Sequence, residues 1–519
     1  MGKVGENIMR RLAWMIVLAC AGCSTGGSDK TESCCVPTPS PTNVPPAKVY
    51  VVLWFDTEDY LSPHDDDAAL RLANFLSAEG IRATFKVVGE KARVLEKRGR
   101  TDAIAALKKH EIGFHSNYHS PHPTPSQYMS ALGWDEGVAE FSRREGPGVD
   151  DLRRIFGVNP TCYGQPGSSW GPQAFGAMKD WGMKAYMDAG SHLGVDGKPH
   201  YFSGLLTLYN LTHHPRTGLG GEKDLVEGKQ HFQKSYDQLM KEGGGIISVY
   251  YHPCEWIHKQ FWDSIFKNGT NPAREDWQMP PQKTPEETQV AFETFEAWIR
   301  WIKTLPDLRF ITVAEAAWVY RDTAVDRTFN AAELKEIAAG VGEEVDFQRR
   351  GDYDLAPSEI FALLNPIVAA YGNEWGPVHP SAKPPSSIKF AGTPQGPTEP
   401  GPALETPLTT TWNQFARTAA WAQEYLSSHD RIPPTVFLGS TGVPPEAYYT
   451  ALARVAGQLI EGKVPESVEI RPAKYTIGAR VADDSPKLFG WLFAEGYHAP
   501  AMMALARRQA WTIKPAIKH

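Results

Sequence analysis

The sequence predicts an α/β fold in which strands and helices alternate over more than half of the chain. From residue 48 to about residue 322, short apolar runs rich in β-branched and aromatic residues alternate with longer amphipathic segments. This alternation is typical of a parallel sheet flanked by helices. A second observation is that polar residues follow several of the apolar runs directly, and that position carries the chemistry of such folds.

Seven runs are predicted to be strands, because each is short, apolar and bounded by helix-like or turn-rich sequence. They are residues 48–55, 82–88, 111–114, 161–163, 184–187, 245–251 and 309–313. Helices are predicted between them over residues 67–79, 93–109, 170–181 and 287–304. The segments 192–222 and 253–283 are predicted to be long irregular loops rich in aromatic residues, and loops of that length are usually functional or flexible.

Four polar residues lie at, or one residue past, the ends of these runs: Asp56, His115, Asp188 and His252. The carboxyl ends of parallel strands meet at one edge of the sheet, so we expect these side chains to come together there. Four solvated surface residues would not be expected to share that position.

A metal site is predicted from His115 and His119 with an acidic residue after the first strand, either Glu58 or Asp59. Two imidazoles and a carboxylate hold a divalent ion and leave one coordination position open for water, as in hydrolases. These ligands suit zinc, cobalt, nickel or manganese, and zinc is the metal that we expect.

The stretch His115-Ser-Asn-Tyr-His119-Ser resembles the second motif of the polysaccharide deacetylases, His-[Ser/Thr]-x-x-His-[Ser/Thr]. This family is also called the NodB-homology group or carbohydrate esterase family 4. Residues 81–89, IRATFKVVG, resemble its second strand, usually written kaTFFvlG, and Asp56 follows the strand end where the first motif belongs. The resemblance covers residues 48–322 and implies a distorted (β/α)7 barrel.

The resemblance also implies a reaction, namely metal-dependent removal of N-acetyl groups from a polysaccharide with release of acetate. Asp56 would be the general base. His252, in the place of the fifth motif, would protonate the departing amine, a task that suits an imidazole at neutral pH. Asp188 is the expected partner of His252, and Glu255 is the second choice.

Two departures from the family pattern affect the predicted site. The usual adjacent Asp-Asp is spread over residues 56–59, so the metal ligand is uncertain by one position. The third motif, usually Arg-x-Pro, is Gly164-Gln165-Pro166, and the arginine that orients the base is missing. Gln165 can hydrogen-bond in its place but supplies no charge.

Residues 1–23 are predicted to be a lipoprotein signal peptide with Cys23 as the lipidated residue; Cys20 is an alternative site and a plain secretory signal is the alternative reading. Basic residues precede an apolar run that is too short to span a bilayer. Residues 24–47, rich in Ser, Thr and Pro, are predicted to be a flexible tether. We therefore expect an extracytoplasmic protein that is anchored to a bacterial membrane.

Residues 323–350 are predicted to be a linker and residues 351–519 a smaller, mostly helical accessory domain. Helix-like segments at 358–371, 412–427 and 447–461 are each followed by a proline and a short β-type run. This weak repeat resembles the pseudomurein-binding repeat of cell-wall proteins. The alternative is a helical domain that only packs against the barrel.

The formal net charge of −7 gives no basic surface for nucleic acid, and we expect no such partner. Cys162 and Cys254 are the cysteines of the folded part, either as a disulfide or as buried free thiols. Two other functions remain open. One is a small-amide C–N hydrolase on the same barrel, and the other is a catalytically decayed, carbohydrate-binding surface lipoprotein.

Overall fold

The computed structural model describes residues 44–372, 382–490 and 492–519. The predicted signal peptide, Cys23 and all but the end of the predicted tether lie outside these residues. Among the described helices, none combines the length and the apolar character needed to span a bilayer.

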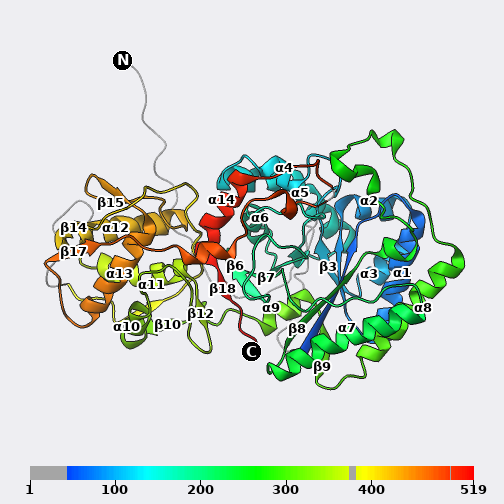
Figure 1. The fold of residues 1–519 in the computed structure, drawn as a ribbon, viewed down its shortest axis with the longest axis horizontal. Helices are drawn as coiled ribbons and strands as arrows, with labels where there is room; N and C mark the ends of the chain where they lie inside the picture. The colour runs from blue at the N-terminus through cyan, green and yellow to red at the C-terminus, as the bar shows by residue number, and fades with distance from the viewer. Residues whose placement is uncertain (1–43, 373–381, 491) are drawn as a thin grey trace, which may run out of the picture. The chain divides into compact units, whose positions relative to one another are not determined.

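The main sheet is built around β1 (Val49–Thr57), a strand that is buried along its whole length. The other predicted strands are all present, and each pairs in parallel with its neighbour: β2 (Thr84–Val87), β3 (Glu111–Phe114), β4 (Cys162–Tyr163), β5 (Ala185–Met187), β8 (Gly245–Tyr251) and β9 (Leu308–Ile311). The predicted α/β fold with a parallel sheet is therefore confirmed (Figure 1).

The sheet continues beyond the predicted strands through β7 (Leu205–Leu208), β6 (His200–Phe202) and β18 (Lys514–Pro515). The prediction of an irregular loop over 192–222 was therefore wrong in part, because β6 and β7 form an antiparallel hairpin with no helical segment between them. The strand order is β18-β6-β7-β5-β4-β3-β2-β1-β8, with β9 also beside β1. Since the described strands at the two ends do not pair with each other, the sheet is a curled, incomplete barrel.

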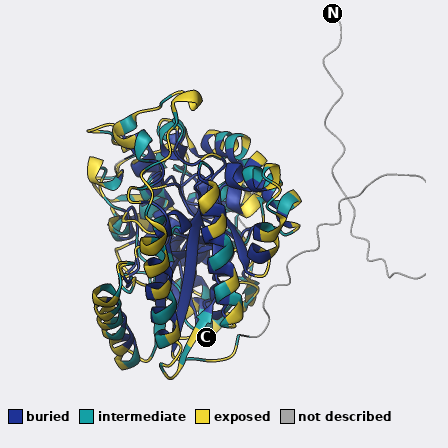
Figure 2. Cartoon of the chain, turned by 90° about the vertical axis from the view of Figure 1, so that its right-hand side faces the viewer, coloured by how far each residue is buried: buried dark blue, intermediate teal, exposed yellow. Residues whose placement is uncertain are grey.

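Helices connect the parallel strands and cover the sheet, and Figure 2 shows buried strands between helices whose outward faces are exposed. They are α1 (Pro63–Ala78), α2 (Gly89–Lys97), α3 (Thr101–Leu107), α4 (Pro125–Met129), α5 (Trp134–Phe156), α6 (Ala174–Asp180), α7 (Glu222–Lys241), α8 (Pro285–Ile302) and α9 (Val313–Val319). The start of α8 follows from its sequence, because Thr284 accepts from the backbone N–H of Glu287 in a capping box.

The two faces of β1 serve different cores, because successive side chains of a strand point to opposite sides. Val51, Leu53 and Phe55 belong to the large core that includes the surrounding helices. Val52 and Trp54 belong to the core inside the barrel. Asp56 continues this inner series at the carboxyl end of the strand. The two cysteines of the described residues, Cys162 and Cys254, are buried free thiols.

The C-terminal part contains α10 (Ala331–Ala339), α11 (Pro357–Ala369), α12 (Trp412–His429), α13 (Pro445–Ile460) and α14 (Pro500–Gln509). The helices predicted in this part correspond to α11, α12 and α13. Each is followed by a short strand, respectively β13 (Ser387–Lys389), β15 (Val436–Leu438) and β17 (Ser467–Ile470). The remaining short elements are β10 (Thr328–Asn330), β11 (Gln348–Arg349), β12 (Asp354–Leu355), β14 (Leu408–Thr411), β16 (Thr441–Val443), η4 (Thr476–Arg480), η5 (Pro486–Leu488) and η6 (Ala510–Thr512).

Two features differ from the predicted division of the chain. The segment predicted as a linker, 323–350, is structured: β10 pairs with β13, and α10 buries Leu334 and Ile337 against its neighbours. The chain also returns to the barrel at its end, where β18 pairs with β6. Lys514 of β18 is buried between Asp322 and Glu359, at 2.6 and 2.8 Å from their carboxylates.

Candidate metal centre and active site

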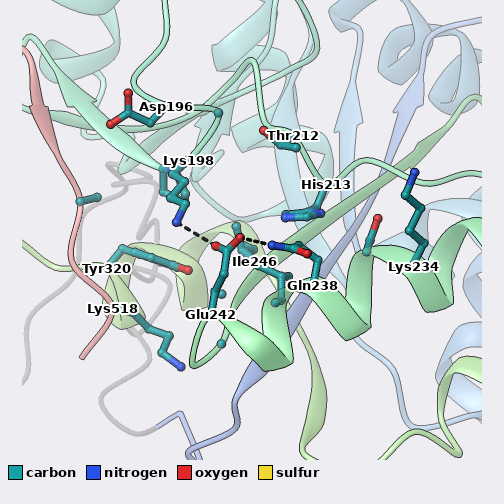
Figure 3. A pocket seen from close by; sticks show the side chains of 17 residues that line it. Asp196, Lys198, Thr212, His213, Lys234, Gln238, Glu242, Ile246, Tyr320 and Lys518 are labelled. Atoms are coloured by element: carbon teal, nitrogen blue, oxygen red, sulfur yellow. Dashed lines mark hydrogen bonds and ion pairs between the residues drawn. The ribbon is translucent and has the colours of Figure 1, made fainter.

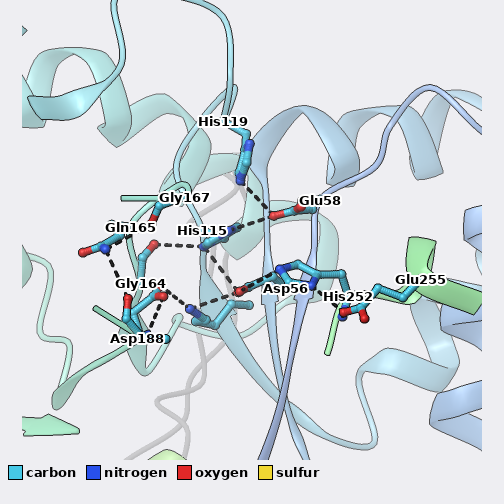
Figure 4. A network of polar contacts seen from close by, with 12 residues as sticks. Asp56, Glu58, His115, His119, Gly164, Gln165, Gly167, Asp188, His252 and Glu255 are labelled. Atoms are coloured by element: carbon cyan, nitrogen blue, oxygen red, sulfur yellow. Dashed lines mark hydrogen bonds and ion pairs between the residues drawn. The ribbon is translucent and has the colours of Figure 1, made fainter. Parts of the chain in front are cut away.

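The polar residues predicted to follow the strands do meet at the carboxyl ends of β1, β3, β5 and β8 (Figure 4). Asp56 is the last residue but one of β1, and Glu58 is the first residue after the strand. Because side chains two residues apart along a strand share a face, both carboxylates point to the same side.

Glu58, His115 and His119 form a compact set that could hold a metal ion. Oε2 of Glu58 lies 3.0 Å from Nε2 of His115 and 2.8 Å from Nε2 of His119. The three ligand atoms all lie within 4.8 Å of one another, and all three residues are buried. The predicted pairing of both histidines with a carboxylate from β1 is therefore present.

The hydrogen bonds of the two histidines orient them as ligands. Nδ1 of His115 lies 3.0 Å from the carbonyl oxygen of Gly164, which can only accept, so Nδ1 carries the proton. Nδ1 of His119 lies 2.6 Å from Oγ of Ser120, whose own proton goes to Asp263. In both rings Nδ1 is thus held as a donor, and Nε2 is the nitrogen that faces Glu58 and that would bind a metal ion in place of a proton, as in metal-bound histidines.

The backbone of the His115–His119 segment is a tight turn rather than a helix. Ser116 and His119 both have a φ of 68°, in the left-handed region. The backbone N–H of His119 donates to Oγ of Ser116 over 2.9 Å. Non-glycine residues in this region are uncommon and cluster at functional sites.

Glu58, rather than Asp59, is the carboxylate of this set. The indole N–H of Trp262 donates to Oε1 of Glu58 over 2.7 Å and leaves Oε2 to face the histidines. Asp59 points elsewhere: its Oδ1 accepts from the backbone N–H groups of Leu61 and Ser62, and its Oδ2 lies 2.8 Å from Nε2 of His258. Asp59 therefore shapes the turn into α1.

The donor set fits a divalent ion with nitrogen and oxygen preference. The pKa of His119 is raised to about 10: burial lowers it, but Glu58 and then Asp263 raise it by more. The site thus favours positive charge at the point where the three ligand atoms converge.

Asp56 lies beside this set and carries three cationic or ionisable neighbours. Its Oδ1 is 3.0 Å from Nζ of Lys86 and 3.4 Å from Nδ1 of His115, and its Oδ2 is 3.7 Å from Nε2 of His252. A second group of possible ligands, Asp56, His115 and Asp188, is geometrically close as well. The ammonium of Lys86 already lies between its two carboxylates, which argues against a metal there.

The predicted substitute for the missing arginine, Gln165, does not contact Asp56. Its amide nitrogen donates to the carbonyl oxygen of Gly167 over 3.0 Å, and its carbonyl oxygen accepts from the hydroxyl of Tyr186. Gln165 therefore holds the loop after β4. The charge beside Asp56 comes from Lys86 on β2 instead.

The predicted order of partners for His252 was also wrong. Nδ1 of His252 lies 2.7 Å from Oε1 of Glu255, whereas Asp188 pairs with Lys86 at 2.7 Å. The short sequence spacing explains the contact, because His252 begins the 3₁₀ turn η1 (Pro253–Trp256) and Glu255 reaches back to its backbone N–H. Arg216 donates to the other oxygen of Glu255.

The neighbours of His252 keep its ring protonated at neutral pH. Burial lowers the pKa of His252, but Glu58, Glu255 and Asp56 raise it by more, to about 9. Burial also raises the pKa of Glu255, and His252 and Arg216 lower it by more, to about 2. The pair is therefore an imidazolium held by a carboxylate, with Nε2 facing Asp56.

Sequence reasoning missed Lys86, Trp262 and Asp263. Lys86 had a signal, since it is a charged residue inside an apolar strand at a position where the resembling motif has phenylalanine. Trp262 and Asp263 had none, because they lie between η1 and η2 (Ser264–Gly269) in the long 253–283 segment, which also contains η3 (Arg274–Asp276). Most aromatic residues of that segment pack inward, as the burial of Trp256 and Trp262 indicates.

Several cavities of the described residues have sizes that suit small ligands, and two of them bear on the site. The larger, about 700 Å³, lies at the start of β8, where Gly245 and Ile246 line it together with Lys198, His213 and Glu242 (Figure 3). Because His252 follows the other end of β8, this cavity is remote from the site. A cavity of about 360 Å³ adjoins the site instead, since Ser116 and His119 line part of it.

Solved structures offer a comparison of the fold. A probable polysaccharide deacetylase from Pseudomonas aeruginosa PAO1 is 14% identical, with a TM-score of 0.35, over 53% of this chain and 94% of that one. The chain is similar to solved polysaccharide deacetylases. The Puue allantoinase gives 13% identity and a TM-score of 0.34, over 53% of this chain and 93% of that one. A family 4 acetyl xylan esterase from Clostridium thermocellum is 15% identical, with a TM-score of 0.26, over 52% of this chain and 91% of that one.

No protein-family model and no curated protein matches the chain. At the identities and TM-scores above, the likeness does not indicate an activity. The residues of the site therefore have to support any proposal about the reaction.

Proposed function

We propose that this protein is a metal-dependent hydrolase that removes N-acetyl groups from an extracytoplasmic polysaccharide and releases acetate. The observation that carries the proposal is the three-ligand set Glu58, His115 and His119 beside a carboxylate–imidazole pair, Asp56 and His252. Hydrolysis of an amide needs a polarised carbonyl, a base for the attacking water and an acid for the leaving nitrogen, and this set supplies each.

A divalent ion, expected to be zinc, would be held by Glu58, His115 and His119, where it would polarise the carbonyl and lower the pKa of water. Asp56 accepts the proton of the attacking water on its carboxylate. His252 donates the proton on Nε2 to the departing nitrogen, while Glu255 holds its Nδ1. The products are acetate and a free amino sugar.

A substrate larger than acetamide is supported by the cavity of about 360 Å³ that adjoins His119. Tyr118 and Tyr128 line it, and Tyr118 is 49% exposed, which is unusual for a large aromatic residue. Exposed aromatic faces pack well on the apolar faces of sugar rings.

Placement at the cell envelope forms part of the proposal. It rests on the predicted signal sequence, with Cys23 as the expected lipidated residue, and on the predicted tether that follows. The helix-then-strand units of the C-terminal part would then bind cell-wall material near the substrate.

The test measures acetate release from N-acetylglucosamine oligomers and cell-wall glycan. In parallel, hydrolysis of a small amide without an acetyl group, allantoin, is followed as the loss of allantoin. The zinc-loaded protein is compared with an Asp56→Asn variant. Release from a glycan that disappears in the variant supports the proposal. Hydrolysis of allantoin alone favours the small-amide reading, and no reaction with any substrate together with no bound metal favours a decayed carbohydrate-binding protein.

A further inference from the structure

Lys86 is a fully buried lysine whose ammonium contacts the predicted general base. We propose that Lys86 is a positioning residue for Asp56, which supplies from β2 the fixed positive charge that the loop after β4 lacks. This inference rests on the proposed function, and it concerns how the site of this chain is assembled. The role of Asp188 follows from it: Asp188 holds the lysine in place.

The Lys86 ammonium makes two hydrogen bonds and one ion pair with Asp56. Nζ lies 2.7 Å from Oδ2 of Asp188, 2.9 Å from the carbonyl oxygen of Met187 and 3.0 Å from Oδ1 of Asp56. Two of the three N–H donors of the ammonium thus have hydrogen-bond acceptors, and the ion pair with Asp56 is the third polar contact. Nζ also lies 4.2 Å from the ring centre of Trp54. The two hydrogen bonds therefore hold the ammonium in one position, in which its charge lies beside Oδ1 of Asp56.

The fold makes room for this side chain at two glycines. Lys86 is the register partner of Asp56 on one side and of Gly113 on the other. A Cβ at Gly113 would lie 2.9 Å from Cγ of Lys86, and a Cβ at Gly164 would lie 2.0 Å from its Nζ. The lysine stem thus passes over β3, and its ammonium occupies the space beside Gly164, the first position of the altered third motif.

The charges support a functional rather than a purely structural role. Burial lowers the pKa of Lys86, but Asp188 and Asp56 raise it by more, so the lysine stays charged. Burying a charge is costly, and an apolar replacement of a buried ion pair is often neutral or stabilising. A lysine kept at the centre of a buried strand therefore indicates that its charge has a use at Asp56.

A purely structural explanation makes a different prediction. In that reading Lys86 only neutralises the buried Asp188, and Asp56 is a bystander. Removing the charges of Lys86 and Asp188 together distinguishes the two readings. The double change leaves no unpaired acid beside Met187, so the structural reading expects no defect. It still deprives Asp56 of its positive partner, so the positioning role expects lower activity.

The experiment compares Lys86→Met, Lys86→Met/Asp188→Asn and Lys514→Met in the full-length, zinc-loaded protein. Lys514 is the matched control, since it too is buried between two carboxylates, at a place remote from the site. We expect Lys86→Met to lower kcat about 100-fold or more, the scale of general-base catalysis, with KM changed less than about threefold. Zinc stoichiometry should stay at the wild-type value, because the three ligands are intact.

The double variant decides between the readings. It should recover thermal stability relative to Lys86→Met and still show the lowered kcat, whereas Lys514→Met should lose stability and keep the kcat of its folded fraction. Recovery of kcat in the double variant, or a Lys86→Met kcat within about threefold of wild type, would overturn the proposal.

A second readout does not depend on turnover. In protein labelled with ¹³C-lysine, the resonance that disappears in Lys86→Met should shift in Asp56→Asn, and the resonance of Lys514 should not. If the wild-type protein releases no acetate, the proposed function fails while this shift still tests the contact. If the chemical shift of the Lys86 resonance is unchanged in Asp56→Asn, the inference is overturned, whatever the activity of the protein.

Discussion

The indole N–H of Trp262 donates to Oε1 of Glu58 across a sequence separation of 204 residues. The next residue, Asp263, accepts the proton of Ser120, whose oxygen holds Nδ1 of His119. Two consecutive residues of the long 253–283 segment therefore support two of the three candidate metal ligands. The segment is therefore part of the candidate metal centre and not only a cover for it.

This relationship predicts that Trp262→Phe weakens metal binding while the fold is kept. The aromatic packing remains, but Oε1 of Glu58 loses its donor. Loss of such outer contacts typically costs about 10- to 100-fold in metal affinity. Zinc titration by calorimetry should show this loss. Trp277→Phe is the control, because Trp277 donates to the carbonyl oxygen of Pro272 in the same segment; an equal loss there would contradict the account.

Glu58→Gln and Asp59→Asn should have opposite effects on metal and stability. Glu58→Gln removes the carboxylate of the ligand set and should abolish stoichiometric zinc binding. Asp59→Asn should retain zinc but lower the free energy of unfolding by about 1–3 kcal/mol, because Asp59 is buried and accepts from Leu61, Ser62 and His258. Metal analysis and thermal denaturation of the two variants check this. Zinc loss in Asp59→Asn with retention in Glu58→Gln would reverse the assignment.

The activity should fall as the pH rises through the pKa of His252. The pKa of this histidine is raised from 6.5 to about 9, so its acid form is present at neutral pH and is lost on the alkaline side. A metal ion would offset part of the contribution of Glu58, so the alkaline limb of kcat/KM is expected between these two values. Glu255→Gln should move that limb to lower pH. An unchanged limb in this variant would mean that another group donates the proton.

Gly113→Ala should reduce activity through Lys86. An added Cβ would lie 2.7 Å from Sγ of Cys162 and 2.9 Å from Cγ of Lys86, so the lysine has to move away from Asp56. We expect a lowered kcat with zinc still bound. Gly342→Ala is the control, since a Cβ there meets no atom within 4 Å. Steady-state kinetics of both variants make the comparison, and full activity of Gly113→Ala would argue against a fixed position for Lys86.

The fold was predicted from local sequence patterns. The seven parallel strands were recognisable because each is an apolar run between helical segments. Strands β6 and β7 gave no such signal, because they form an antiparallel hairpin with no helix between them. The end of the chain could not be predicted to join the sheet, because β18 is a two-residue strand that pairs with β6 over a long sequence separation.

The candidate site was predictable where its residues are close in sequence or follow strands. His115 and His119 lie in one turn, and strand alternation alone would have favoured Glu58 over Asp59, since Glu58 shares the face of Asp56. The pairing of His252 with Glu255 was also predictable, because the two residues are only three positions apart in the sequence. Lys86, Trp262 and Asp263 depend on how distant segments pack, and only the polarity of Lys86 within its strand gave a hint.

The most direct measurement is metal reconstitution followed by acetate release. The full-length protein is stripped with a chelator, titrated with zinc, and assayed on N-acetylglucosamine oligomers at each step, beside a His115→Ala/His119→Ala variant. The account predicts that acetate release rises linearly and saturates at one zinc per chain, and that the variant neither binds zinc nor releases acetate. Acetate release that is independent of zinc, or equal in the variant, would contradict it.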